Sequence, residues 1–184
     1  AEYFGVTTDT VFEIGLTPNM IDCSSHYGVA RALAAYYNLQ KPVRAKLPEI
    51  TGLKKENENG AVSISVEAPE ACIRYSGLTI RGIKVEPSPA WLQTRLRAIG
   101  LNPINNVVDI TNFVLHETGQ PLHAFDVAAI KGGTVRVRHL PEKTKFVTLD
   151  GVVRTLSSSD LMICNQEEGM CIAGVFGGLS SGVT

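Results

Sequence analysis

The stretch from Asn105 to Asp126 reads NNVVDITNFVLHETGQPLHAFD and divides into two parts. In the first part, apolar residues recur at three- and four-residue spacing through Val107, Ile110 and Val114, which predicts an amphipathic helix. Gly119 follows this pattern at the position where a helix C-cap favours glycine. Polar side chains also interrupt the apolar run. Because buried polar groups need hydrogen-bond partners, we expect them either to be bonded to one another or to face a ligand.

The second part, QPLHAFD at residues 120–126, brings an amide, an imidazole, an aromatic ring and a carboxylate close together in the chain. His123 is therefore the first candidate for chemistry. The competing interpretation is a structural imidazole that bonds to the backbone or to Asp126. The polar residues Gln120, Thr111 and Asn112 favour a ligand site over it. Residue chemistry alone predicts an α+β domain with a ligand pocket near Thr111, Asn112 and His123.

Strand signals lie on both sides of this stretch. Alternating or short apolar runs predict strands at 11–16, 62–66, 73–85, 134–138, 161–164 and 171–178. A hairpin is expected over residues 146–153, where Asp150-Gly151 is a favoured two-residue turn.

Two more helices are expected. One follows a cap at Asp22, Ser24 or Ser25 and runs to about Asn38. The other starts at residues 88–89, a Ser-Pro pair with serine at the cap. Helices interspersed among hairpin-rich strands indicate an α+β fold with two to three helices and mainly antiparallel or mixed sheets, not a doubly wound parallel sheet.

The length of 184 residues is enough for one sizeable core, so we expect a single domain over residues 1–184. Residues 54–60, KKENENG, are the clearest polar surface loop. This loop is too short to link independent domains.

Composition limits the classes of partner. Lys+Arg number 17 and Asp+Glu 18, which gives a net charge of −1 and argues against a surface that coats nucleic acid. Contact with one end of a nucleic acid stays open. No apolar run reaches membrane-spanning length, and the start of the chain has no basic region followed by an apolar one. We therefore expect a cytoplasmic protein without a membrane partner.

Metal ligands are not expected. The four cysteines form no CxxC pair, so we expect free, buried thiols and no structural zinc. They are Cys23, Cys72, Cys164 and Cys171. His116 and His123 are seven residues apart with a helix-breaking segment between them, which does not match a metalloprotease helix. His26 and His139 are expected to be structural.

Other motifs give weaker signals. GVFGG at 174–178 can bring backbone N–H groups against a ligand, yet it matches neither a phosphate loop nor a dinucleotide fingerprint. Taken alone, the motif is better explained as a tight strand end. No Gly-x-Ser-x-Gly elbow occurs, and no ATP-binding signature is visible.

Several segments together resemble one family, the β chain of bacterial phenylalanine–tRNA ligase. The matching motifs are TPNxxDC at 17–23, GVAR at 28–31, RYxG at 74–77, PSPxWL at 87–92, INNVVDITN at 104–112, GQPLHAFD at 119–126, TLDG at 148–151 and AGVFGG at 173–178. They occur in order across almost the whole chain, and the long central match is the most specific. Met20 departs from the family, which usually has arginine there.

The resemblance implies a layered β/β/α editing domain in the centre of a longer β chain. Such a domain hydrolyses tyrosine that was joined by mistake to the phenylalanine tRNA. A pocket shaped for a phenyl ring cannot strongly reject a ring that adds a hydroxyl, whereas a second site with a polar partner for that hydroxyl can select tyrosine.

Carried over position by position, the resemblance assigns Thr111, Asn112, His123 and Gly177 to the lining of the editing pocket. Thr111 and Asn112 would orient the amino acid, and the His123 imidazole would position the hydrolytic water or the terminal ribose. His123 is not assigned as an obligatory general base. The family's acidic residue that recognises the tyrosine hydroxyl would lie beyond Thr184, so we expect this chain to fold but to discriminate tyrosine weakly.

The resemblance also implies partners and cofactors. They are a catalytic α chain in an α2β2 heterotetramer and the 3′ end of the phenylalanine tRNA. ATP and magnesium are implied for the whole enzyme, and no cofactor is expected in this piece. Two alternatives stay open: a non-catalytic module for assembly or for binding the tRNA end, and a free-standing hydrolase of misacylated tRNA.

Overall fold

The computed structural model describes residues 9–54 and 60–183, so most of the predicted polar loop at 54–60 lies outside the described residues. The chain forms two compact units. The first draws on Ala1–Leu53 and Val85–Leu122, and the second on Lys54–Lys84 and His123–Thr184. Each unit is described by itself below.

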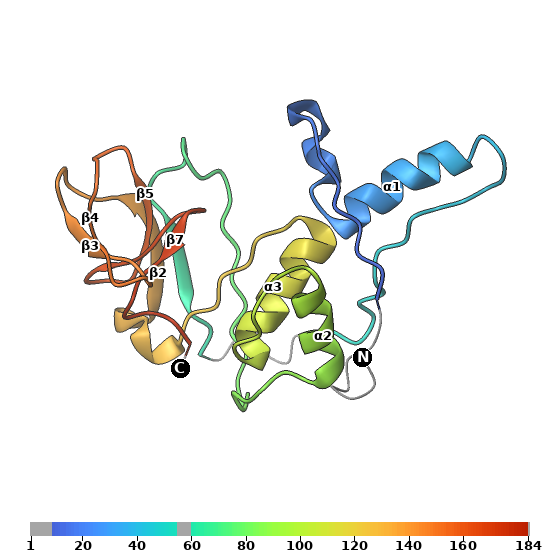
Figure 1. The fold of residues 1–184 in the computed structure, drawn as a ribbon. Coiled ribbons are helices and arrows are strands. Elements are labelled where there is room, and N and C mark those ends of the chain that lie inside the picture. The colour runs from blue at the N-terminus through green and yellow to red at the C-terminus, as the bar shows by residue number, and fades with distance from the viewer. Residues whose placement is uncertain (1–8, 55–59, 184) are drawn as a thin grey trace. The chain divides into compact units, whose positions relative to one another are not determined.

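The regular elements of the first unit, among its described residues, are all helices. Its helices are η2 (Pro18–Cys23), α1 (His26–Tyr37), α2 (Ala90–Ala98) and α3 (Asn106–Thr118), and Figure 1 labels α1, α2 and α3. The Ser25 side chain caps α1 by accepting a hydrogen bond from the Gly28 N–H at 2.9 Å. This selects Ser25 among the three caps that the sequence allowed.

Helix α3 begins and ends where the sequence predicts. The Asn105 side chain accepts hydrogen bonds from the backbone N–H groups of Val107 and Val108 at 3.1 and 2.9 Å. Gly119 closes the helix with φ of +80°, a left-handed conformation that favours glycine. Local chemistry at both ends therefore fixes the length of α3.

One polar residue of α3, Asp109, is buried and hydrogen-bonded within the protein. Asp109 has a relative exposure of 0%. The Ser88 hydroxyl donates to it at 2.5 Å, and the Ile104 N–H donates at 2.8 Å. The prediction that Ser88 caps α2 is therefore wrong: Pro89 is the N-cap residue, because the Ser88 hydroxyl is used by Asp109.

The second unit carries both sheets. A five-stranded sheet has the order β1-β2-β5-β6-β7, with β1 parallel to β2 and the other neighbours antiparallel. Its strands are β1 (Ser63–Val66), β2 (Thr134–His139), β5 (Leu161–Cys164), β6 (Gly169–Ile172) and β7 (Phe176–Gly177). A hairpin of β3 (Lys145–Val147) and β4 (Val153–Thr155) forms a second, antiparallel sheet (Figure 1). The 3-10 helices η3 (Val127–Ala129) and η4 (Lys131–Gly133) precede β2.

Two apolar clusters form the core of the second unit. Alternation along β2 buries Val135 and Val137. The first cluster contains Ile130, Val135, Ile163, Met170 and Cys171. The second joins the hairpin to the large sheet through Phe146, Leu156, Met162 and Cys164.

The predicted α+β class, with mixed sheets and two to three helices, is confirmed. Three strand predictions are wrong in detail. Residues 11–16 and 73–85 are irregular, and 171–178 divides into parts of β6 and β7. A strand needs a ladder partner, and within the described ranges the first two runs have none. The hairpin is confirmed, but residues 148–152 connect its strands in place of a two-residue turn.

No helix in the described portion of the chain is both long and apolar enough to cross a lipid bilayer.

Candidate functional site around His123

His123 is anchored in the second unit by its ring neighbours. The His123 and Phe125 ring centroids are 4.4 Å apart at an interplanar angle of 56°. Phe125 in turn packs against the first apolar cluster of that unit. The imidazole therefore has a fixed apolar support on one side, while the residue as a whole stays exposed.

Gly177 provides the second contact to this ring. A Cβ atom built on Gly177 would lie 2.8 Å from His123 Cε1 and 3.4 Å from Nε2. It would also lie 2.8 Å from Leu149 Cδ1. The imidazole and the leucine methyl thus occupy space that only a glycine at 177 leaves open, and the structure brings together two of the four residues assigned from sequence.

The chemistry available to His123 follows from its surroundings. Desolvation by partial burial lowers the pKa of His123 below its ordinary value of 6.5. Within the described ranges neither ring nitrogen has a hydrogen-bond partner in the protein. At neutral pH the imidazole is therefore uncharged and offers one N–H donor and one lone pair to a ligand or a water.

The loop between β3 and β4 delivers Leu149 to this contact. The Leu149 N–H donates to the Gly177 carbonyl at 3.0 Å, and Thr148 forms an isolated bridge with Gly178. Thr-Leu-Asp-Gly predicted a hairpin turn and matched a family motif, and neither signal placed Leu149 beside Gly177. Its register opposite β7 depends on the fold of the whole unit.

Polar contacts hold that loop in shape. The buried Thr148 hydroxyl donates to Asp150 Oδ1 at 2.5 Å, and the Val152 N–H donates to the same oxygen at 3.1 Å. Arg154 donates to Asp150 Oδ2 at 3.0 Å. The hydrogen bonds from Thr148 and Val152, together with Arg154, lower the pKa of Asp150, so this carboxylate is charged at neutral pH.

Thr111 and Asn112 lie on α3 in the first unit, both half-buried. The Thr111 hydroxyl donates its proton to the Val108 carbonyl at 2.7 Å, so its oxygen is left as an acceptor. The Asn112 carbonyl accepts a hydrogen bond from His116 Nδ1 at 2.9 Å. The side-chain amide of Asn112 has no hydrogen bond within the part of the chain that the structure describes.

The other histidines are tied to backbone carbonyls. His26 Nδ1 donates to the His116 carbonyl at 2.9 Å, and His139 Nδ1 donates to the Asp160 carbonyl at 3.1 Å. These bonds agree with the structural roles expected for His26 and His139. His123 differs from them because its ring nitrogens face no protein acceptor in the described ranges.

The cysteines are free, and three of them are buried. Burial raises the pKa of the Cys171 thiol to about 11 and also raises the pKa of Cys164. Both thiols are therefore protonated and unreactive at neutral pH. Among the described residues, no three His, Cys, Asp or Glu side chains lie close enough together to hold a metal ion.

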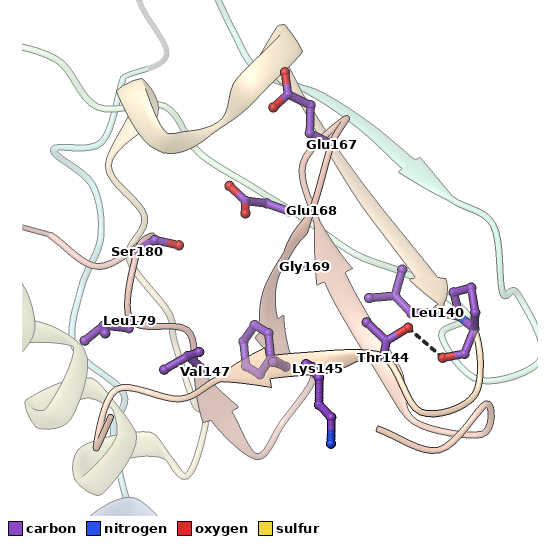
Figure 2. Close-up of a pocket in the computed structure, with 11 residues that line it drawn as sticks. Leu140, Thr144, Lys145, Val147, Glu167, Glu168, Gly169, Leu179 and Ser180 are labelled. Atoms are coloured by element: carbon purple, nitrogen blue, oxygen red, sulfur yellow. Dashed lines mark hydrogen bonds between the residues drawn. The ribbon is translucent and has the colours of Figure 1, made fainter. Parts of the chain in front are cut away.

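A pocket of about 450 Å³ lies elsewhere in the second unit. Figure 2 shows Glu167 and Glu168 at one end of it and Leu140 and Thr144 at the other. None of the four residues assigned from sequence lines it. It is therefore separate from the His123 contact.

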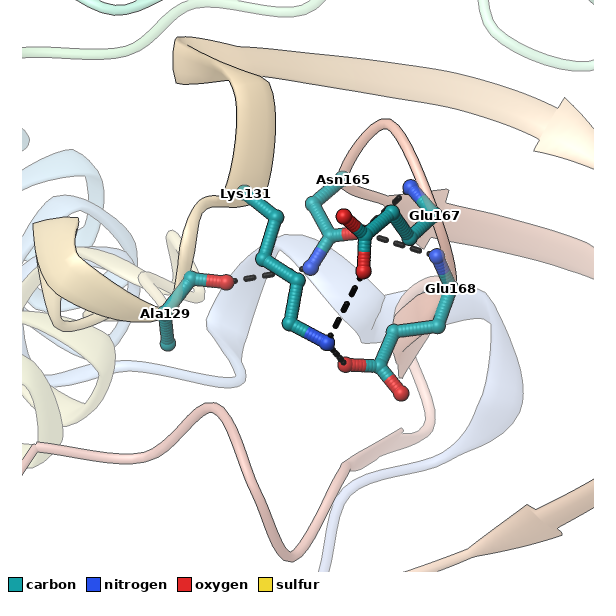
Figure 3. Close-up of polar contacts among 5 residues, drawn as sticks. All are labelled: Ala129, Lys131, Asn165, Glu167 and Glu168. Atoms are coloured by element: carbon teal, nitrogen blue, oxygen red, sulfur yellow. Dashed lines mark hydrogen bonds and ion pairs between the residues drawn. The ribbon is translucent and has the colours of Figure 1, made fainter.

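At the acidic end of this pocket, hydrogen bonds and ion pairs stabilise the turn between β5 and β6 (Figure 3). The Asn165 side chain accepts hydrogen bonds from the Glu167 and Glu168 N–H groups at 2.8 Å each and donates to the Ala129 carbonyl at 3.0 Å. Lys131 pairs with both carboxylates at 3.1 and 2.8 Å. These groups satisfy one another, which explains them without a ligand.

Comparison with known proteins shows the family of the chain. Residues 71–184 match the model of the B3/4 domain family. The chain is 55% identical to the phenylalanine–tRNA ligase β subunit of Bacteroides fragilis over 185 aligned residues, which cover 100% of the chain and 22% of that protein. It is also 55% identical to the β subunit of Porphyromonas gingivalis, and this alignment covers 100% of the chain and 23% of that protein. The identity to the β subunit of Fusobacterium nucleatum is 46%, and this alignment covers 96% of the chain and 22% of that protein. The chain thus spans about a fifth of the length of the curated relatives that it matches.

Proposed function

Because the chain belongs to the B3/4 domain family, we propose that it is the editing module of a phenylalanine–tRNA ligase β chain and that both of its units belong to this one module. The reaction proposed is hydrolysis of the ester that links tyrosine to the phenylalanine tRNA. The observation that carries the proposal is the place of the His123 imidazole, which lies against Gly177 and has no hydrogen bond to a protein group in the described ranges. The identity to β subunits across the whole chain supports it.

The reaction needs a polar group beside the ester. Water attacks the carbonyl carbon of the tyrosine ester, the bond to the ribose oxygen breaks, and the leaving oxygen takes up a proton. A neutral imidazole holds the attacking water, or the neighbouring ribose hydroxyl, by accepting a hydrogen bond at its lone pair. A lowered pKa keeps that lone pair available at neutral pH. His123 therefore positions the water or the ribose hydroxyl, even where another group transfers the proton to the leaving oxygen.

Recognition of the amino acid is assigned to α3. Thr111 presents an acceptor oxygen because its proton is bonded to Val108, which suits the α-ammonium group of an aminoacyl ester. The Asn112 amide offers both a donor and an acceptor. Gly177 contributes space for the imidazole, and its carbonyl is already used by the Leu149 N–H.

The remaining parts of the proposal concern the whole enzyme. We assign aminoacylation, with its ATP and magnesium, to a catalytic α chain that joins the β chain in an α2β2 heterotetramer. The 3′ end of the phenylalanine tRNA is the substrate that reaches this module, and the cytoplasm is the compartment where it works.

The proposal is tested by hydrolysis of aminoacyl-tRNA. The full-length β chain with its catalytic partner is mixed with phenylalanine tRNA carrying labelled tyrosine or labelled phenylalanine, and release of each amino acid is timed. We expect tyrosine to be released faster than phenylalanine, and Thr111→Val and Asn112→Ala each to slow that release. Equal, background rates for both esters would contradict editing and leave a module for assembly or for binding the tRNA end.

A further inference from the structure

The side chain of Arg154 contacts both segments that bracket the His123 ring. On one side it reaches the loop 148–152, where Arg154 Nη2 lies 3.0 Å from Asp150 Oδ2 and Arg154 Nε lies 3.3 Å from Thr148 Oγ1. On the other side its guanidinium carbon lies 5.9 Å from the centre of the Phe176 ring. Phe176 directly precedes Gly177 in β7.

Each of these segments contributes one residue at the space that a side chain on Gly177 would fill beside the imidazole. The loop carries Leu149, and β7 carries Gly177. A Cβ on Gly177 would meet His123 Cε1 and Leu149 Cδ1 at the same distance of 2.8 Å, so ring, leucine and glycine fit together at one point. A displacement of either segment changes the room left for the ring.

Backbone hydrogen bonds also link the two segments. The bonds between them nearest the ring are the Leu149 N–H to the Gly177 carbonyl at 3.0 Å and the Leu179 N–H to the Val147 carbonyl at 3.1 Å. Strand β7 contains only Phe176 and Gly177, and both residues pair with β6, so this ladder is short. A side chain that contacts both segments therefore adds a constraint that these backbone hydrogen bonds do not supply.

We propose that Arg154 is a positioning residue of the His123 site, which fixes the loop of Leu149 and the strand of Gly177 relative to each other and so sets the place of the imidazole. The planar guanidinium suits this role because it bonds two oxygens in a fixed geometry while its face lies over an aromatic ring. A lysine at this position would supply the positive charge but not the planar pair of N–H donors. Asp150, held as a carboxylate by Thr148 and Val152, is the acceptor that orients the guanidinium.

The inference rests on the proposed function for its activity measurement only, since the place of the ring is measured independently. The chain offers a matched control on the same hairpin. Lys145 is a second exposed cation, and its Nζ donates to Thr155 Oγ1 at 2.6 Å, a contact confined to the hairpin. Lys145→Gln removes a charge and a cross-strand bond without touching the loop or Phe176.

The experiment compares Arg154→Gln, Arg154→Lys and Lys145→Gln with the parent protein, in the full-length β chain with its catalytic partner. Histidine labelled with ¹³C at Cε1 reports the ring directly, and His123→Gln identifies its resonance. We expect Arg154→Gln to shift the His123 signal, Arg154→Lys to shift it in the same direction, and Lys145→Gln to leave it in place. In tyrosyl-tRNA hydrolysis we expect kcat to fall about tenfold in Arg154→Gln with KM nearly unchanged, as for a misplaced group.

The outcomes separate the two proposals. An unmoved His123 signal in Arg154→Gln, or an equal shift in Lys145→Gln, overturns the positioning role whatever the activity. A shifted signal in an enzyme whose parent form hydrolyses no tyrosine ester supports the positioning role and overturns the proposed function. The thermal unfolding midpoint of each variant is recorded as well. A shift of the His123 resonance that appears only in variants with a lowered midpoint argues against the positioning role of Arg154.

Discussion

The imidazole of His123 lies directly on the backbone of Gly177, so closely that a methyl group at 177 would come within 2.8 Å of His123 Cε1. Two segments more than fifty positions apart in sequence thus meet at one point of the second unit. The fit requires a glycine for its lack of a side chain and not for its backbone conformation, because Gly177 is absent from the glycines with positive φ. The contact is therefore open to a direct test by single substitutions.

Gly177→Ala should displace the imidazole and leave the fold intact. The added methyl meets two side-chain tips, His123 Cε1 and Leu149 Cδ1, and both can move only by giving up their present positions. We expect a loss of about 1–3 kcal/mol in the free energy of unfolding, typical of overpacking, and a loss of tyrosyl-tRNA hydrolysis of about tenfold or more.

Gly182→Ala is the matched control for Gly177→Ala, because the nearest atom to its added methyl is Leu149 Cδ2 at an ordinary 3.7 Å. Urea unfolding and the hydrolysis assay are run on both variants. Equal effects of the two substitutions would mean that the His123–Gly177 contact has no special place in the site.

The pH dependence of stability should reveal the environment of His123. In the unfolded chain the imidazole titrates near 6.5, and in the folded chain its pKa is lower. Between these two values the unfolded state binds more protons, so the free energy of unfolding falls as the pH falls through this window and levels off below it. We expect His123→Gln to lose this part of the dependence. A folded-state titration midpoint of His123 at or above 6.5, measured by NMR, would contradict the account.

Ser88→Ala should destabilise the first unit. The Ser88 hydroxyl is one of the donors to the fully buried side chain of Asp109, and losing it leaves Asp109 Oδ2 without this hydrogen bond. We expect a cost of about 1–3 kcal/mol in urea unfolding. Thr94→Ala is the control, since the Thr94 hydroxyl donates only to the Ala90 carbonyl of its own helix. A cost for Ser88→Ala no greater than that for Thr94→Ala would refute the importance of the buried pair.

Asn105→Ala should shorten α3 at its first turn. The lost side chain caps two backbone N–H groups, and we expect about 1 kcal/mol of destabilisation together with faster amide exchange at Val107 and Val108. Asn102→Ala, in the exposed loop before the helix, serves as the comparison. Unchanged exchange at Val107 and Val108 in Asn105→Ala would rule out the cap as the cause of the helix start.

What the sequence predicts well is local. Helix α3 ends at the predicted Gly119, which acts on backbone groups within a few residues, whereas the Asn105 cap at its start was not predicted. Strand predictions at 11–16 and 73–85 are wrong because a strand also depends on a partner far along the chain, which alternation cannot supply.

The site shows the same division. His123 could be selected from its polar neighbours and from the family resemblance, but its contact with Gly177 depends on the register of β7 beside the β3–β4 loop. The supporting residues Thr148 and Arg154 were missed. A hint was present in the sequence, since the oppositely charged Asp150 and Arg154 stand four residues apart across the predicted Asp150-Gly151 turn.

Single-turnover hydrolysis of tyrosine from the phenylalanine tRNA tests the central claim most directly. The assay uses the full-length β chain with its catalytic partner, in parent form and with His123→Ala or His139→Ala. The control His139 is bonded to the Asp160 carbonyl in the same unit. The account predicts that His123→Ala slows tyrosine release by about tenfold to a hundredfold while His139→Ala leaves it near the parent rate. Tyrosine release at the parent rate in folded His123→Ala would contradict it.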